Sequence, residues 1–117
     1  MSMFAHDHTP QVDATAAVAL FHEGAVLIDV REPDEWQAGH APQAIHIPLG
    51  ELGAQISRMS TDHPLVIICR SGRRSDLATA ALRTAGYDAY NFSGGMQAWH
   101  QAGGDIVTAD GTPGSVI

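Results

Sequence analysis

Two short apolar runs constrain the fold of this chain more than any other feature. Residues 25–30 read AVLIDV, and residues 65–69 read LVIIC. Both runs are short and rich in β-branched side chains, which is typical of strands buried on both faces. Such strands belong to parallel sheets, because the helices that connect parallel strands cover the two faces of the sheet.

Helical patterns alternate with these strands. The strongest pattern is in residues 75–85, where Leu77, Ala78, Ala81, Leu82 and Ala85 fall on one stripe and Gly86 follows as a stop signal. The sequence also predicts helices over residues 14–22, 33–37, 49–59 and 95–102, and strands over 44–48 and 88–92. This alternation predicts an α/β fold: a three-layer sandwich with a mainly parallel central sheet flanked by helices.

Length and charge limit the function classes. The 117 residues are 44% hydrophobic and 16% charged, which indicates one globular domain. We place it at residues 9–107, with residues 1–8 and 108–117 as loose terminal segments. A net charge of −7 argues against nucleic acid or membrane as a partner. The chain has no lysine, which excludes Schiff-base and Walker-A chemistry.

Cys69 is the only cysteine of the chain. One cysteine forms no disulfide within the chain and no thiolate zinc cluster, so we expect no metal site there. The pair His6 and His8 is weak metal evidence, because further ligands are missing. The first ten residues lack a secretory pattern, so we expect a reducing compartment such as the cytoplasm. Any modification of Cys69 must then be resolved by another molecule.

The segment that follows Cys69 reads RSGRRS and connects the predicted strand to the predicted helix. In open α/β sheets, ligands bind beyond the carboxyl ends of strands, and a helix N-terminus favours an anion. Arg70, Arg73 and Arg74 crowd the same loop, and Gly72 adds backbone freedom. All these features lower the pKa of a thiol, and the thiolate is the reactive form. The alternative is a small core cysteine, which needs none of them.

The spacing of the loop separates two chemistries. A cysteine phosphatase needs five residues between its cysteine and the arginine that closes around a phosphate. Here that place is taken by Ser75, and Arg74 comes after four residues. The shorter loop suits a smaller terminal atom on the cysteine, such as a persulfide sulfur.

Three motifs in residues 9–107 resemble the rhodanese family of sulfurtransferases in its single-domain form. The first is LIDVREPDEW at residues 27–36, followed by GHAPQAIHIP at 39–48. The second is CRSGRRS at residues 69–75, which looks like the six-residue active loop of the family. The third is NFSGGMQAW at residues 91–99, with the closing Gly-Gly-x-x-x-Trp element. Ala41 and Gln43 depart from the Gly-His-Ile-Pro-Gly-Ala pattern that is frequent in the family, outside the active loop.

The resemblance implies sulfur transfer through a Cys69 persulfide, without a cofactor. The donor would be thiosulfate or a similar small molecule, and the acceptor cyanide, a thiol or a protein thiol. The backbone N–H groups of residues 70–74 would cradle the terminal sulfur. Arg70, with Arg73 or Arg74, would hold the donor. The predicted substrate-binding residues are Arg70, Ser71, Gly72, Arg73 and Arg74.

Other functions and roles stay open at this stage. One alternative is a persulfide carrier that delivers sulfur to a partner protein, and another is a phosphatase or arsenate reductase of related fold. We expect Arg31 to pair with an acid such as Glu35 and to fix a loop. Asp76 is expected to offset the charge of Arg73. We expect packing roles for Trp36 and Trp99, and no role as bases for His40 and His46.

Overall fold

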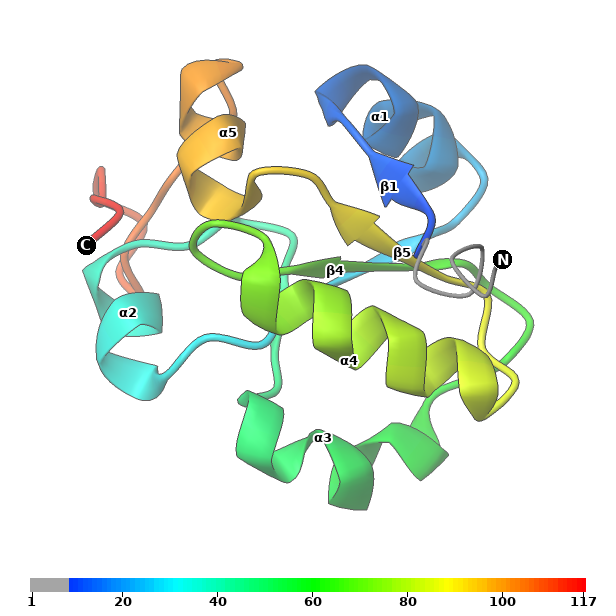
Figure 1. The fold of residues 1–117 in the computed structure, drawn as a ribbon. Coiled ribbons are helices and arrows are strands. Elements are labelled where there is room, and N and C mark those ends of the chain that lie inside the picture. Colours follow the sequence, from blue (N-terminus) through cyan, green and yellow to red (C-terminus); the bar gives the residue numbers. More distant parts are fainter. Residues whose placement is uncertain (1–8) are drawn as a thin grey trace.

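The computed structural model describes residues 9–117, and its centre is a parallel sheet of five strands (Figure 1). The strand order is β1-β5-β4-β2-β3, and all four neighbouring pairs are parallel. The strands are β1 (Gln11–Val12), β2 (Val26–Asp29), β3 (Ile45–His46), β4 (Leu65–Ile68) and β5 (Ala89–Phe92). The helices are α1 (Ala14–His22), α2 (Pro33–Ala38), α3 (Leu49–Gln55), α4 (Arg73–Thr84) and α5 (Gly95–Gln101), with a 3₁₀ turn at Ile56–Arg58.

Helices cover both faces of the sheet, which confirms the predicted three-layer sandwich. In Figure 1, α1 and α5 lie above the sheet, α3 and α4 lie below it, and α2 lies at one end. The side chains of β4 alternate between two cores: Leu65 and Ile67 pack with Leu82 of α4, and Val66 and Ile68 pack with Trp99 of α5. β4 is fully buried, as its β-branched sequence predicts.

The helix over 75–85 is confirmed, but it begins earlier and its stripe is only partly buried. α4 begins at Arg73, directly after Gly72. Ala78 and Leu82 are buried, whereas Leu77 is 70% exposed. The face that meets the sheet uses Ser75 and Thr79 in place of Leu77, because these polar side chains find hydrogen-bond partners there.

Two further differences concern element bounds. The pattern at residues 49–59 forms the short helix α3 followed by a 3₁₀ turn. The strand β1 was not predicted, since it has only two residues and one buried side chain. It pairs with β5 through Gln11↔Asn91 and Val12↔Phe92, which places Gln11 near the site described below.

Residues 108–117, which the sequence predicts to be loose, make specific contacts. Ser115 N–H donates to the Ala38 carbonyl at 2.8 Å, and Val107 forms isolated bridges with His40 and Pro113. A side chain at Gly39 would meet the Ser115 backbone at 2.6 Å, so the segment packs closely on the end of α2. The predicted loose segment 1–8, with His6 and His8, lies outside the described residues. Within residues 9–117, no helix combines the length and the apolar character that spanning a membrane requires.

Candidate active site

Cys69 follows β4 directly, and its sulfur accepts three hydrogen bonds from the next turn of the chain. The N–H of Gly72 lies 3.1 Å from Sγ, the N–H of Ser75 lies 3.3 Å from it, and the Ser75 hydroxyl lies 3.2 Å from it. The residue is only 1% exposed, and Ser75 is fully buried. Its sulfur therefore lies at the start of α4, where N–H groups without helical partners point toward it.

The two consecutive glycines of the third motif hold this loop in place. Met96 N–H donates to the Cys69 carbonyl at 2.7 Å, and Gln97 N–H donates to the Arg70 carbonyl at 3.1 Å. Gly95 has a φ of +60°, and a Cβ there would lie 2.4 Å from the Cys69 carbonyl oxygen. These two bonds hold the carbonyl groups of residues 69 and 70 against α5, while the N–H groups of Gly72 and Ser75 point to Sγ.

This environment favours the thiolate of Cys69. Burial raises the pKa of the Cys69 thiol, but hydrogen bonds from the Ser75 hydroxyl and from the N–H groups of Ser75, Gly72 and Ser71 outweigh that effect. The pKa is therefore lowered from its ordinary value. The sequence predicts that arginines cause part of the lowering of the Cys69 pKa. The groups that bond to the sulfur are instead backbone amides and one hydroxyl.

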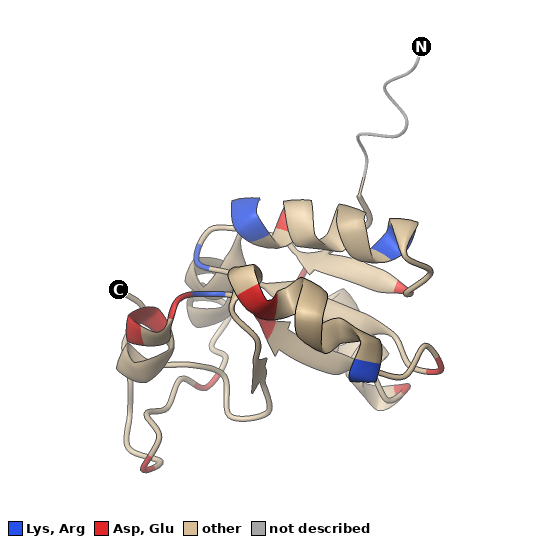
Figure 2. Ribbon diagram, turned by 90° about the horizontal axis from the view of Figure 1, so that it is seen from below, with Lys and Arg blue, Asp and Glu red and all other residues tan. Residues whose placement is uncertain are grey.

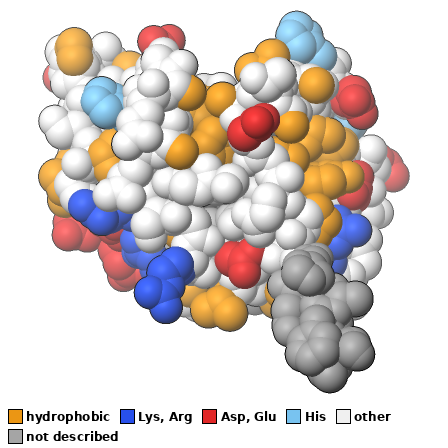
Figure 3. Space-filling model, turned by 45° about the horizontal axis from the view of Figure 1, so that its top comes forward, with side chains coloured by type: hydrophobic (Ala, Val, Ile, Leu, Met, Phe, Trp, Pro, Cys, Tyr) orange, Lys and Arg blue, Asp and Glu red, His pale blue; other side chains and the backbone are white. Residues whose placement is uncertain are grey.

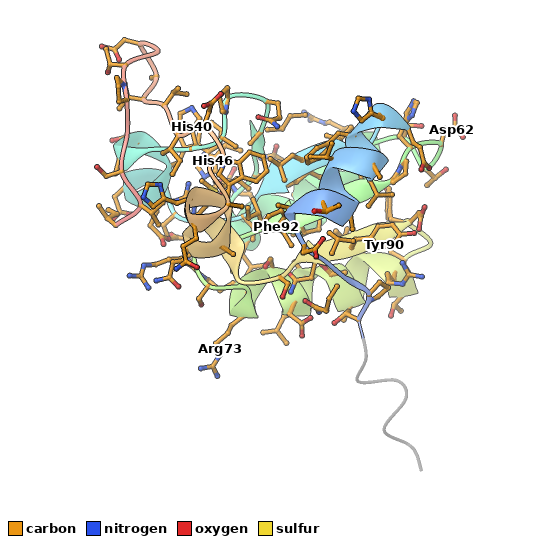
Figure 4. The ribbon with its side chains drawn as sticks, turned by 90° about the horizontal axis from the view of Figure 1, so that it is seen from above. His40, His46, Asp62, Arg73, Tyr90 and Phe92 are labelled. Carbon is orange, nitrogen blue, oxygen red and sulfur yellow. The ribbon has the colours of Figure 1, made fainter. Side chains whose placement is uncertain are left out.

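The three arginines of the loop are directed to different places. Arg74 forms a two-pronged ion pair with Glu35 of α2, at 2.7 and 2.8 Å. The Nε of Arg70 donates to the Ile117 main-chain oxygen at 2.7 Å. Arg73 is exposed and extends away from the body of the protein (Figure 4). Contact of these side chains with a donor stays a prediction.

Arg31 pairs with Asp29, not with the Glu35 carboxylate as predicted. Both side chains are fully buried, and Arg31 reaches Asp29 with its Nε and with its Nη2 at 2.8 Å. The same guanidinium donates to the carbonyls of Glu35 and Gly39. The expected loop-fixing role is thus present with another acid, because Asp29 ends β2 beside the guanidinium and Glu35 is engaged by Arg74.

The Glu35–Arg74 pair joins α2 to α4 next to the loop. The hydrogen bond from Arg74 outweighs partial burial and lowers the pKa of Glu35 from 4.5 to about 2. Figure 2 shows the basic start of α4 and the acidic α2 at the same end of the molecule. Arg74, which is separated from Cys69 by four residues, is therefore already neutralised by the Glu35 carboxylate.

Aromatic stacking completes this end of the protein. The Trp36 ring stacks on His40 with centroids 3.6 Å apart and on His46 with centroids 4.7 Å apart. His40 Nδ1 bonds to the Trp36 carbonyl and His46 Nε2 to the Arg31 carbonyl. Trp99 packs in the core and donates to the Asp105 carbonyl at 2.9 Å. The predicted packing roles of Trp36 and Trp99 agree with these contacts.

A hollow lies elsewhere, between α1 and α5 (Figure 3). Its volume is about 310 Å³, and Val18, Phe21 and Trp99 contribute to its wall. None of its lining residues belongs to the loop 69–74. The hollow is therefore separate from the Cys69 loop.

Sequence reasoning missed a polar network behind Cys69. The Ser75 hydroxyl also lies 2.5 Å from Asn91 Oδ1, and the Asn91 amide donates to Gln11 Oε1 at 2.8 Å and to the Gly72 carbonyl at 3.2 Å. Asp76 accepts from Gln11 and Thr9, and the predicted offset of the Arg73 charge by Asp76 stays a prediction. Ser75 and Asn91 each belong to a motif, which was an available signal, whereas nothing in the sequence marks Gln11.

Known proteins share this architecture. Residues 13–102 match the model of the rhodanese-like domain. A rhodanese-related protein from Thermoplasma volcanium has a TM-score of 0.77 and 28% identity, over 84% of this chain and 97% of that one. A thiosulfate sulfurtransferase from Pseudomonas aeruginosa has a TM-score of 0.79 and 26% identity, over 97% of this chain but only 23% of the longer protein.

A third similar structure bears on the phosphatase alternative. It is a protein from Rhodopseudomonas palustris described as of unknown function and possibly a tyrosine phosphatase, with a TM-score of 0.71 and 28% identity over 84% of both chains. The family match covers most of this chain, from α1 to the end of α5, and includes the loop 69–74. The chain belongs to the rhodanese-like domain family.

Proposed function

We propose that this protein is a sulfurtransferase that moves a sulfane sulfur from thiosulfate or a similar donor to a thiophilic acceptor through a Cys69 persulfide. The observation that carries the proposal is the set of three hydrogen bonds on Sγ, which come from Gly72 and Ser75 and lower the pKa of the thiol. A stabilised thiolate at a helix N-terminus is the nucleophile that this reaction needs.

In the first half-reaction the Cys69 thiolate attacks the outer sulfur of thiosulfate. A bond forms between Sγ and that sulfur, and the sulfur–sulfur bond of the donor breaks, with its electron pair leaving on sulfite. The negative charge of the enzyme passes from Sγ to the terminal sulfur. In the second half-reaction cyanide or a thiolate attacks the terminal sulfur, and the Cys69 thiolate returns.

The loop residues have proposed roles in holding the donor and the terminal sulfur. Backbone N–H groups of residues 70–74 would stabilise the terminal sulfur anion as an oxyanion hole does. Arg70 and Arg73 would attract a dianionic donor, because neither guanidinium forms an ion pair with an aspartate or glutamate side chain of the described residues. Arg74 would contact the donor from the edge of the loop, with its own charge balanced by Glu35.

The position of Ser75 favours sulfur transfer over phosphate hydrolysis. In the phosphatase spacing this position carries the arginine that surrounds the phosphate. Here it is a fully buried serine whose hydroxyl lies 3.2 Å from Sγ. A guanidinium has no place there, so the loop supports a single added atom better than a phosphate.

Incubation with thiosulfate tests the proposal. Intact-protein mass should rise by one sulfur atom, the gain should disappear on treatment with cyanide, and thiocyanate should form. Cys69→Ser should abolish all three effects, since the chain has no other cysteine. Continued turnover of thiosulfate and cyanide by Cys69→Ser would contradict the proposal, and so would phosphatase or arsenate reductase activity that depends on Cys69.

The single cysteine also favours a second candidate, a persulfide carrier with a protein thiol as acceptor. No second thiol of this chain is available to resolve the persulfide, so the acceptor is another molecule. A carrier should load its sulfur but turn over small donors slowly, in a reducing compartment such as the cytoplasm. Thiosulfate turnover at ordinary enzyme rates without a partner would exclude it.

A further inference from the structure

The Ser75 hydroxyl has one proton and two acceptors. It lies 3.2 Å from Cys69 Sγ and 2.5 Å from Asn91 Oδ1, and all three residues are at least 97% buried. A serine hydroxyl donates one hydrogen bond at a time. In this dry environment a second acceptor at such a distance cannot be satisfied by water, so the direction of one proton affects the charge that Sγ can carry.

The orientation of the Asn91 amide is set by its other contacts. Its nitrogen donates to Gln11 Oε1 and to the Gly72 carbonyl, both of which are acceptors only. Rotation of the amide would place Oδ1 against these two oxygens. Asn91 therefore presents Oδ1 to Ser75. The Ser75 proton is held toward Asn91 whenever Sγ carries no charge.

The network continues to a carboxylate. Gln11 Nε2 donates to Asp76 Oδ1 at 2.8 Å, while Gln11 Oε1 accepts from Asn91. All donors in this chain point the same way, from Ser75 through Asn91 and Gln11 to Asp76. Aligned hydrogen bonds polarise one another, which makes Asn91 Oδ1 a stronger acceptor.

We propose that Asn91 is a positioning residue that holds the Ser75 proton away from Cys69 Sγ, so that the Ser75–Asn91 pair favours the states in which Sγ is uncharged. The inference rests on the proposed function. In the neutral thiol and in the persulfide, Sγ carries no charge and the Ser75 hydroxyl donates to Asn91. In the free thiolate the proton must turn to Sγ, and two oxygens then face each other at 2.5 Å without a proton between them.

The consequence for the reaction is a bias toward the loaded enzyme. The thiolate remains accessible because Gly72 and Ser75 N–H groups bond to Sγ. Attack on the donor moves the charge to the terminal sulfur and releases the Ser75 proton back to Asn91. The pair thus helps to drive charge off Sγ, which stabilises the persulfide relative to the thiolate.

Other charged groups surround Cys69 and must stay constant in a test. Arg74 of α4 is paired with Glu35 of α2, Asp76 bonds to Gln11 and Thr9, and Arg70 and Arg73 extend from the loop. None of these is changed by substitution of Ser75 or Asn91. Variants at the two positions therefore report on the hydroxyl proton with the surrounding charges unaltered.

The test is a double-mutant cycle on the pKa of the unloaded Cys69 thiol, measured from the pH dependence of iodoacetamide alkylation. Asn91→Leu frees the hydroxyl for Sγ and should lower the pKa. Ser75→Ala removes the donor and should raise it. In the Ser75→Ala background, Asn91→Leu should have no further effect. An equal effect of Asn91→Leu in both backgrounds would overturn the proposal.

A second variant covers the case in which Asn91→Leu fails to fold. Asn91→Ala removes the same acceptor without adding a charge and with less bulk than leucine, so the pKa of Cys69 should fall as it does in Asn91→Leu. A raised or unchanged pKa in Asn91→Ala would contradict the proposed direction.

Persulfide loading gives an independent readout. At a pH above the pKa of the thiol, the ratio of sulfite to thiosulfate that gives half-loading by intact mass should fall about tenfold in Asn91→Leu, the effect of one hydrogen bond to a charged group. An unchanged ratio would overturn the inference. If no form of the protein takes up sulfur, the proposed function fails, whereas the alkylation cycle still decides the role of Asn91.

Discussion

The buried and exposed sides of the Cys69 loop use different chemistry. On the buried side, neutral donors from Gly72 and Ser75 bond to the sulfur, and the carbonyls of residues 69 and 70 bond to the start of α5. On the exposed side lie three guanidiniums, one paired with Glu35, one bonded to the main-chain oxygen of Ile117 and one extended into solvent.

The difference shows which groups fix the geometry of the Cys69 loop and which groups set the electric field around it. A buried hydrogen bond to a charged sulfur contributes more than an exposed guanidinium, whose charge water and salt screen. Substitutions on the buried side should therefore alter folding and the thiol itself. Substitutions on the exposed side should alter the capture of an anionic donor.

The largest expected effect is on the buried pair that supports the site from β2. Arg31→Met leaves the carboxylate of Asp29 buried without its partner, so the free energy of unfolding should fall by about 3–5 kcal/mol. Urea denaturation followed by circular dichroism measures it. The control is Arg83→Met, whose partner Asp88 lies 3.7 Å away with both side chains exposed, and it should cost less than about 1 kcal/mol. Equal losses of unfolding free energy in the two variants would contradict the larger contribution of the buried Arg31–Asp29 pair.

The next effect is expected at the contact between the loop and α5. Gly95→Ala combines a φ of +60° with a Cβ 2.4 Å from the Cys69 carbonyl, so we expect a loss of about 3 kcal/mol and impaired sulfur uptake. Gly86→Ala is the matched control, because Gly86 has a φ of +98° but open space around its Cβ position. If both variants lost equal stability and kept full sulfur uptake, the close approach would have no functional role.

A smaller effect is expected where the two sides meet, at the Glu35–Arg74 pair. The pKa of Glu35 is about 2 in the folded protein and about 4.5 when unpaired, so the pair stabilises the fold above pH 4.5. Its contribution should disappear as the pH falls from 4.5 to 2. Glu35→Gln should cost about 1 kcal/mol at pH 7, because the partner is partly exposed and screened. The difference from the parent protein should vanish near pH 2, and a difference that is independent of pH would count against the pair.

The smallest effect on folding is expected on the exposed side. Arg73→Gln should leave the free energy of unfolding unchanged and raise KM for thiosulfate a few-fold, with the increase lost in high salt. Arg58→Gln removes the same charge at the 3₁₀ turn after α3 and serves as the control. A similar rise of KM in both variants would show that only net charge matters.

The sheet and its helices were predictable because their signals are local. Buried runs such as residues 65–68 carry enough β-branched side chains to identify a strand, and Gly86 ends α4 as expected. The short strand β1 carries no such signal, since its pairing with β5 is a contact between distant segments. The contacts of residues 108–117 with the end of α2 are likewise contacts between distant segments.

The position of Cys69 in the candidate site was predictable, and its supporting contacts were less so. Cys69 and its loop follow from the position after a buried strand. The choice of Asp29 by Arg31 and of Glu35 by Arg74 depends on three-dimensional placement. The proposed role of Asn91, in β5, depends on the hydroxyl of Ser75 in α4, which lies 2.5 Å away. Residue types indicate that such groups bond to something, and only the fold selects the partner.

The most direct test of the central claim is the pKa of the Cys69 thiol in the parent protein and in the double variant Arg70→Gln/Arg73→Gln, measured by alkylation across pH. We predict a pKa below the ordinary value in the parent, and the same lowered pKa in the double variant, because the loop amides and Ser75 remain. A thiol that returns to its ordinary pKa when the two guanidiniums are removed would contradict the account.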